Sequence, residues 1–317
     1  WPTTPGGHLM MKSPLASASN LDKEALFFVR SDVEAHSFTP KNSQSYGEPQ
    51  MRIENEHSFR DALGSSINLF LGAGFSILAE GKSGQLPVGG ALATELRAEF
   101  GVDPTSAMGL PQLSTVISAA QYDKFERYLR SRFTVSRFDS RYCALQSIAV
   151  SSIFSTNIDN LVQEIYKNDK TRFLNDIFTH GATPNGRESI DLIQLHGSVN
   201  DPSRPLTFTP LDIAAASSSD PDRWSLFRTR LLQTPTLYWG YSMADSGTLQ
   251  AVRAGSSPSG AAGEAWIQVR DSSDTASIEY FRAIGLQVIE ADTNEMLDYL
   301  SEFSKSQPDA VVPASLE

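Results

Sequence analysis

Short apolar runs alternate with amphipathic segments through the middle of the chain, and this alternation strongly limits the folds open to it. Six runs are too short for helices and are bounded by polar residues or glycine. They are residues 67–71, 152–155, 192–195, 236–239, 265–269 and 286–289. We predict that each forms a β-strand.

Residues with helical spacing follow several of these runs. Leu92, Leu96 and Phe100 recur every four residues, and Leu161, Val162 and Ile165 form a second apolar stripe. Strands that alternate with helices form a parallel sheet covered on both faces. We therefore predict an α/β fold, a Rossmann-like doubly wound parallel sheet of about six strands.

A further helix is predicted near the C-terminus. Asp292 and Glu295 have the spacing of a capping box. The apolar positions that follow at helical spacing are Met296, Leu297, Leu300 and Phe303.

Composition divides the chain into regions. Residues 1–50 are rich in Ser, Pro, Asn and Gly around an apolar island at 25–29, and we expect an N-terminal extension that faces a partner or another subunit. Residues 51–303 are predicted to form the main domain, with a helical insertion at 102–147. Residues 304–317 are expected to be a C-terminal tail.

Charge and cysteine content exclude several classes of function. The formal net charge of −11 would repel a phosphate backbone, so nucleic acid is not expected as a direct ligand. The single cysteine, Cys143, excludes an internal disulfide and a cysteine-ligated zinc site, and we expect it to be a small core residue. No apolar run approaches the ~20 residues that span a bilayer, and no signal-peptide pattern is present. A cytoplasmic protein without a metal is expected.

Glycines and polar residues cluster just after four of the predicted strands. The clusters are residues 72–76, 156–159, 196–198 and 240–242. The carboxyl ends of parallel strands face one crevice, where ligands bind. These distant segments are therefore predicted to meet at one ligand.

Each cluster also has a purely structural interpretation. Gly72 and Gly74 permit a sharp turn and close approach to a ligand, but position 77 is Ile, so the third glycine of the dinucleotide fingerprint is missing. Asn157 and Asp159 could cap a helix that begins near residue 160. His196 could be a buried histidine with satisfied hydrogen bonds, although Gly197 beside it would leave room for a ligand.

Taken together and in order, the clusters resemble the sirtuin-fold (silent-information-regulator-like) family. The resemblance covers about residues 60–303 and rests on Gly-Ala-Gly-Phe-Ser, Asn-Ile-Asp, His-Gly and Gly-Tyr-Ser. Within this family the chain is similar to the prokaryotic NAD hydrolases of antiphage defence rather than to the protein deacylases. The loop after Ser76 lacks the Pro-Asp-Phe-Arg of the deacylases, and their four zinc cysteines are absent.

The resemblance implies a set of NAD-contacting residues in which Asn157 and His196 are catalytic. It implies that Asp159 lies by the nicotinamide carboxamide and that Ala73, Gly74 and Ser76 line the phosphates. It also implies that Gly240 and Ser242 contact the adenosine half. The residues implied to bind NAD are Gly72, Ala73, Gly74, Ser76, Thr156, Asp159, Gly240, Ser242 and Asp245. Asp245 could equally cap the next helix.

The chemistry of NAD cleavage agrees with these two residue types. Nicotinamide leaves as a neutral base from a cationic pyridinium, so catalysis mainly requires a stabilised ribose cation and a positioned water. His196, with an ordinary pKa of ~6.5, can accept a proton from water or a ribose hydroxyl. Asn157 offers an uncharged donor and acceptor for ribose hydroxyls and water.

Three alternatives were weighed against an NAD hydrolase. Gly240-Tyr241-Ser242 approaches the nucleophile elbow of a serine hydrolase, but no histidine follows His196, so the required residue order cannot be formed. An NAD-dependent deacylase and a non-catalytic module that senses NAD or ADP-ribose remain open.

Partners are expected on functional grounds. An unrestrained NAD hydrolase would empty the cell of NAD, and assembly is the usual restraint in the family that the chain resembles. We therefore expect a homo-oligomer, a second defence-system protein as partner, or both, with residues 1–50 and 102–147 contributing.

Overall fold

The structure is a computed structural model that describes residues 51–176, 189–219, 221–243, 264–270 and 273–306. All of these residues belong to the compact unit Gly47–Glu317. The predicted extension 1–50, most of the predicted tail 304–317 and Asp245 lie outside the described residues.

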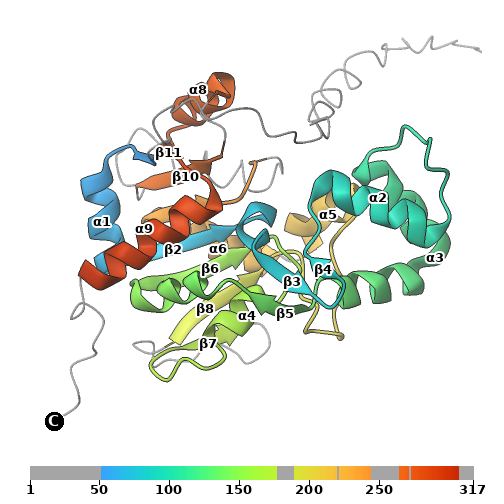
Figure 1. Ribbon diagram of the computed structural model, residues 1–317, viewed down its shortest axis with the longest axis horizontal. Helices are drawn as coiled ribbons and strands as arrows, with labels where there is room; N and C mark the ends of the chain where they lie inside the picture. The colour runs from blue at the N-terminus through green and yellow to red at the C-terminus, as the bar shows by residue number, and fades with distance from the viewer. Residues whose placement is uncertain (1–50, 177–188, 220, 244–263, 271–272, 307–317) are drawn as a thin grey trace, which may run out of the picture. The chain divides into compact units, whose positions relative to one another are not determined.

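An eight-stranded sheet forms the centre of this unit (Figure 1). In spatial order its strands are β1 (Arg52–Ile53), β11 (Gln287–Glu290), β10 (Ala265–Val269), β9 (Thr236–Trp239), β2 (Ile67–Leu71), β6 (Val150–Ser155), β8 (Ser189–Gln194) and β7 (Phe173–Asp176). Every neighbouring pair is parallel except β1 and β11. The six predicted strands are all present, and the predicted parallel sheet is confirmed. The edge strands β1 and β7 were not predicted.

The direction of winding reverses at β2. From β2 the chain continues through β6 to β8 on one side, then returns to β9 on the other side and continues through β10 to β11. In the register of these strands, Leu71 pairs with Ser155 of β6 and with Trp239 of β9. The carboxyl ends of the three strands are therefore level, which is the arrangement that creates a ligand crevice in open α/β sheets.

Helices cover both faces of the sheet. The helical segments are α1 (Glu56–Ser65), η2 (Ala73–Ser76), α2 (Gly89–Phe100), α3 (Leu110–Arg132), η3 (Ser140–Ser147), α4 (Leu161–Tyr166), α5 (Pro210–Ser219), α6 (Pro221–Gln233), α8 (Thr275–Ala283) and α9 (Thr293–Ser306). Alternate residues of β2 enter different cores: Leu69 and Leu71 pack with α1, α4 and α9, whereas Phe70 packs with α6 and α8. All five residues of β2 are buried, as expected for a central strand of a doubly wound sheet.

The predicted capping box is confirmed at the start of α9. Asp292 Oδ1 accepts a hydrogen bond from the Glu295 amide at 2.9 Å, and Glu295 Oε2 accepts one from the Asp292 amide at 2.7 Å. The four apolar residues of the predicted stripe are buried against the sheet. The stripes of α2 and α4 are buried as well.

A second sheet and two helices form a layer beside the carboxyl edge of the main sheet. Its strands, in spatial order, are β4 (Gly84–Gln85), β3 (Ala79–Gly81) and β5 (Val135–Phe138), all antiparallel. Helices α2 and α3 share a separate apolar core that also includes Ile158, Val199 and Leu206. Residues 102–147 contain α3, β5 and η3, so the expected helical segment also contributes a strand. Strands this short leave no readable alternation in the sequence.

The prediction that Cys143 is a core residue was wrong. Its side chain is exposed, whereas Tyr142 and Leu145 of η3 are buried. A 3₁₀-helix has three residues per turn, so residues 142 and 145 share a face that excludes 143.

Among the described residues, no helix combines the length and the apolar character needed to cross a membrane.

Candidate active site

A cavity of about 280 Å³ lies between the carboxyl edge of the main sheet and the layer of α2, α3 and α5. The loops after β2, β6 and β8 supply most of its polar lining, and α3 adds Ser114. The lining residues from these loops include Ala73, Ser76, Thr156, Asn157, Asp159, His196 and Thr207. The predicted convergence of three clusters is therefore present in the structure.

Asn157 is fixed by its side-chain amide. Nδ2 donates to the Gly72 carbonyl oxygen at 2.9 Å and to Ser76 Oγ at 3.1 Å. Its backbone amide donates to Ser155 Oγ at 3.0 Å. Because both Nδ2 hydrogens are used in these contacts, the side chain can offer a ligand only its carbonyl oxygen, an acceptor. The sequence had allowed both a donor and an acceptor role.

Asp159 is a buried carboxyl group at the base of the cavity. Its side chain is bonded to the Ser76 hydroxyl and accepts a hydrogen bond from the Leu161 amide at 3.0 Å. Burial raises the pKa of Asp159, and these two hydrogen bonds oppose the rise. Asn160 is the N-cap residue of α4, and Asp159 contacts the first amide of this helix from the position before it. Asp159 also lines the cavity.

Gln194 holds the loop that carries Asn157 and Asp159. Its Nε2 donates to the Asp159 carbonyl oxygen at 3.2 Å and to the Asn157 carbonyl oxygen at 3.5 Å. Gln194 ends β8, two residues before His196. The side chain of Gln194, at the end of β8, thus holds the loop after β6 in place beside His196.

His196 is 7% exposed and lines the cavity. Its carbonyl oxygen accepts a hydrogen bond from the Thr207 amide at 2.9 Å. Gly197 has φ +82°, and a Cβ there would lie 3.0 Å from the Pro205 carbonyl oxygen. The glycine therefore lets the loop return against itself, and the space that we expected for a ligand is occupied by Pro205 and Leu206.

Gly72, Gly74 and Gly240 form a backbone contact between the loops after β2 and β9. A Cβ on Gly72 would lie 2.5 Å from the Gly240 carbonyl oxygen, and one on Gly74 would lie 2.7 Å from Gly240 Cα. These glycines do not line the cavity. The close approach that they permit is between the loops after β2 and β9, rather than between a loop and this cavity.

The fourth cluster lies beside the cavity rather than in its lining. Gly240 and Ser242 follow β9, and Ser242 is exposed. The Gly240 amide donates to Gln268 Oε1 at 2.9 Å, which ties this loop to β10.

The apolar wall of the cavity was not predicted as part of the site. It comprises Leu86, Pro87, Val88, Leu92, Leu110, Pro111, Phe133, Ile158, Phe208, Pro210 and Ile213. Apolar spacing identified Leu92 as a buried helical residue, but no local pattern could distinguish a cavity wall from a core. Within the described residues, no group of three or more His, Cys, Asp or Glu side chains could hold a metal.

Comparison with known proteins gives one family match. Residues 151–289 match the model of a SIR2-like domain. This segment is therefore similar to SIR2-like domains. It spans Asn157, Asp159, His196 and the loop after β9.

No curated protein matches the chain. Among solved structures, a complex of a mutant Sir2 homologue with ADP-ribose is similar over 81% of this chain and 99% of its own, with 12% identity and a TM-score of 0.43.

Proposed function

We propose that the cavity binds NAD and hydrolyses its nicotinamide–ribose bond, giving nicotinamide and ADP-ribose. The observation that carries the proposal is the meeting of Asn157, Ser76, Asp159 and His196 in one cavity at the point where the sheet reverses its winding. Residues 151–289, which include three of these four residues, are similar to SIR2-like domains.

Asn157 orients the ribose or the attacking water. Its Nδ2 is held by Gly72 and Ser76, so its carbonyl oxygen accepts a hydrogen bond from a ribose hydroxyl or from water. The group is uncharged and stabilises a ribose cation without forming an ion pair with it. Because the side-chain amide of Asn157 is already held by these hydrogen bonds, it loses little conformational freedom when the substrate binds.

His196 accepts the proton in this reaction. Water forms the new bond to the anomeric carbon, and the electron pair of the breaking bond goes to the nicotinamide nitrogen. The proton from the attacking water goes to the imidazole and is later released to solvent. The half-enclosed apolar wall limits access of other water to the ribose cation.

The size of the cavity favours one half of the dinucleotide. Pockets for small ligands usually measure about 300–1,000 Å³. At about 280 Å³, this cavity fits the nicotinamide riboside half better than a whole dinucleotide. The adenosine half is then expected to extend toward Gly240 and Ser242, the neighbouring loop.

We further propose that this activity depletes NAD in antiphage defence. The support is the similarity of the loop after Ser76 to that branch of the family. Restraint by an oligomer or by a second defence protein belongs to the same proposal.

The test is product analysis on the full chain. Purified protein is incubated with NAD, alone and with candidate partners, and nicotinamide and ADP-ribose are resolved by chromatography. Equal release of both supports a hydrolase. Turnover that requires an acyl-lysine peptide would identify a deacylase instead, and tight NAD binding without any product would identify a sensing module.

A further inference from the structure

The loop that begins at His196 closes on itself. The Thr207 amide donates to the His196 carbonyl oxygen at 2.9 Å, which joins the two ends of the loop. Inside it, the Val199 amide donates to the Ile158 carbonyl oxygen at 2.8 Å. The loop has no strand or helix of its own, and within it the Asp201 amide donates to the Ser198 carbonyl oxygen at 3.1 Å. Most of its other backbone carbonyls need partners from outside the loop.

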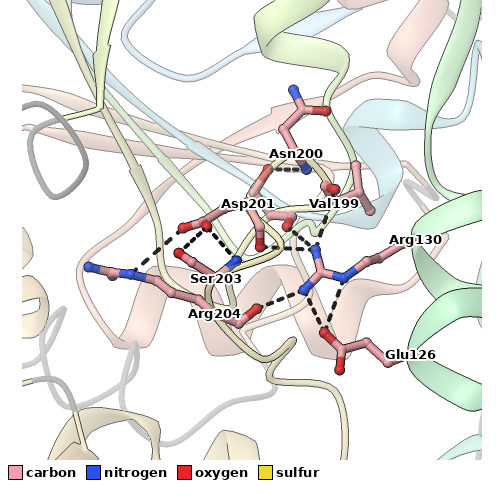
Figure 2. A network of polar contacts seen from close by, with 8 residues as sticks. Glu126, Arg130, Val199, Asn200, Asp201, Ser203 and Arg204 are labelled. Carbon is pink, nitrogen blue, oxygen red and sulfur yellow. Dashed lines mark hydrogen bonds and ion pairs between the residues drawn. The ribbon is translucent and has the colours of Figure 1, made fainter. Parts of the chain in front are cut away.

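Arg130, near the end of α3, supplies these partners (Figure 2). Its guanidinium donates to the carbonyl oxygens of Ser198 at 2.9 Å, Val199 at 3.3 Å, Asp201 at 3.0 Å and Arg204 at 2.7 Å. Glu126 lies one helical turn earlier, and its Oε1 accepts a hydrogen bond from Arg130 Nε at 3.1 Å. Its carboxylate thus balances the positive charge of Arg130. Four carbonyls of one loop thus share one planar cation.

Side chains within the loop shape the turn that faces Arg130. Asp201 Oδ1 accepts from the Ser203 amide at 3.0 Å and from the Ser203 hydroxyl at 2.5 Å. Ser198 Oγ accepts from the Asn200 amide at 3.2 Å. These contacts satisfy the amides of Asn200 and Ser203 within the turn. The carbonyl oxygens of the same turn point toward the guanidinium of Arg130, as Figure 2 shows.

Arg130 does not line the cavity, but both ends of its loop do. His196 and Thr207 line the cavity, and Phe208 continues its wall. The side chain of Arg130 is only 17% exposed, and burial strengthens charge-assisted hydrogen bonds. Arg130 therefore connects this loop to α3, whose apolar residues lie in a different core from those of β8.

We infer that Arg130 is a positioning residue that fixes His196 for NAD cleavage by clamping the carbonyls of the loop 197–206. This inference rests on the proposed function. Removing the clamp displaces the imidazole from the attacking water, whereas Ser76 and Asn157, which bind from other loops, keep their contacts. A misplacement of about 1 Å can lower a rate by about 100-fold.

The experiment compares three variants of the full chain. Arg130→Gln removes the cation and most donors, and Arg130→Lys keeps the charge but has three donors instead of five. Arg127→Gln, an exposed residue of the same helix, removes an equal charge without touching the loop. Circular dichroism and thermal unfolding measure the folded fraction of each variant. The rate of each variant is then divided by its concentration of folded protein.

We expect Arg130→Gln to lower kcat about tenfold or more while KM stays within about twofold. Arg130→Lys should have an intermediate kcat, and Arg127→Gln should match the parent protein. An Arg130→Gln protein that unfolds at a lower temperature but keeps its kcat would overturn the inference, because Arg130 would then act on stability alone. If Arg130→Gln does not fold, the same criterion applies to Arg130→Lys.

A readout without turnover separates this inference from the proposed function. The imidazole signals of His196, assigned by their loss in His196→Asn, should shift in the NMR spectrum of Arg130→Gln and not in that of Arg127→Gln. If the parent protein cleaves no NAD, the proposed function fails, and the NMR comparison still decides whether Arg130 positions His196. An unchanged His196 signal in Arg130→Gln would overturn the inference.

Discussion

The Gly74 amide donates to the Gly240 carbonyl oxygen at 2.9 Å, so the loops after β2 and β9 meet backbone to backbone. Gly240 has φ +65°, and a Cβ there would lie 2.0 Å from the Phe75 nitrogen. The Thr293 hydroxyl donates to the Gly74 carbonyl oxygen at 2.9 Å, which ties α9 to the same point. This contact fixes the loop whose residues Ala73 and Ser76 line the cavity.

Gly240→Ala should therefore destabilise the fold by about 3 kcal/mol or more, since a clash with backbone adds to the cost of the left-handed conformation. Gly101→Ala is the matched control because Gly101 has φ +66° with open space around it. That variant should lose only about 1–2 kcal/mol. Chemical denaturation of both variants measures the difference, and equal losses would show that the contact contributes nothing beyond backbone conformation.

Replacing Asn157 should abolish NAD cleavage in a folded protein. Asn157→Ala is expected to lower kcat by about 100-fold or more because the water or ribose loses its orienting acceptor. Asn157→Asp should fail as well, because a carboxylate cannot donate to the Gly72 carbonyl oxygen. Asn168→Ala, at an exposed position, serves as control. Full activity in Asn157→Ala would remove Asn157 from the proposed mechanism.

Replacing His196 should also remove activity. Loss of a general base is expected to lower kcat by about 100-fold to 10,000-fold in His196→Ala. His57→Ala removes an exposed histidine of α1 and should leave the rate unchanged. Initial rates of nicotinamide release measure both variants, and a folded His196→Ala protein that retains turnover would rule out the proton-transfer role.

The buried Asp159 should make the protein less stable as pH rises. Its pKa is raised in the folded state, so the folded protein holds the proton more tightly, and stability falls between the unfolded value of ~3.9 and the raised folded value. Asp159→Asn should therefore be more stable than the parent at pH 7, with the difference vanishing near pH 4.

Asp139 provides a control of opposite sign. Hydrogen bonds from Arg141 lower the pKa of Asp139, so Asp139→Asn should be less stable than the parent at pH 7 and should match it at low pH. Thermal unfolding over a pH series tests both variants. A stability difference for Asp159→Asn that does not change with pH would contradict the raised pKa of Asp159 in the folded protein.

NAD cleavage should survive strong chelation. The proposed steps use Asn157 and His196 and require no metal ion. Activity is measured after dialysis against EDTA, with and without added zinc. Activity that disappears on chelation and returns with zinc would mean that a metal takes part.

Local sequence patterns determined the secondary structure and the order of the site segments. Thr236–Trp239 and Ala265–Val269 are strands with the predicted bounds, and Asp292 with Glu295 caps α9 as predicted. These features depend on residues close in the chain, whose spacing matches the period of a strand or helix. The carboxyl ends of predicted parallel strands also indicated that Asn157 and His196 would meet.

Only the tertiary structure decided what each site residue contacts. The sequence could not show that Gly72 and Gly74 pack on Gly240, because that contact joins loops far apart in the chain. Nor could it show that Arg130 holds the loop after His196, since any helical arginine on a polar face has the same local pattern. The spacing of residues along the chain determines which face of an element is apolar, whereas the partner of a polar group depends on how separate elements pack.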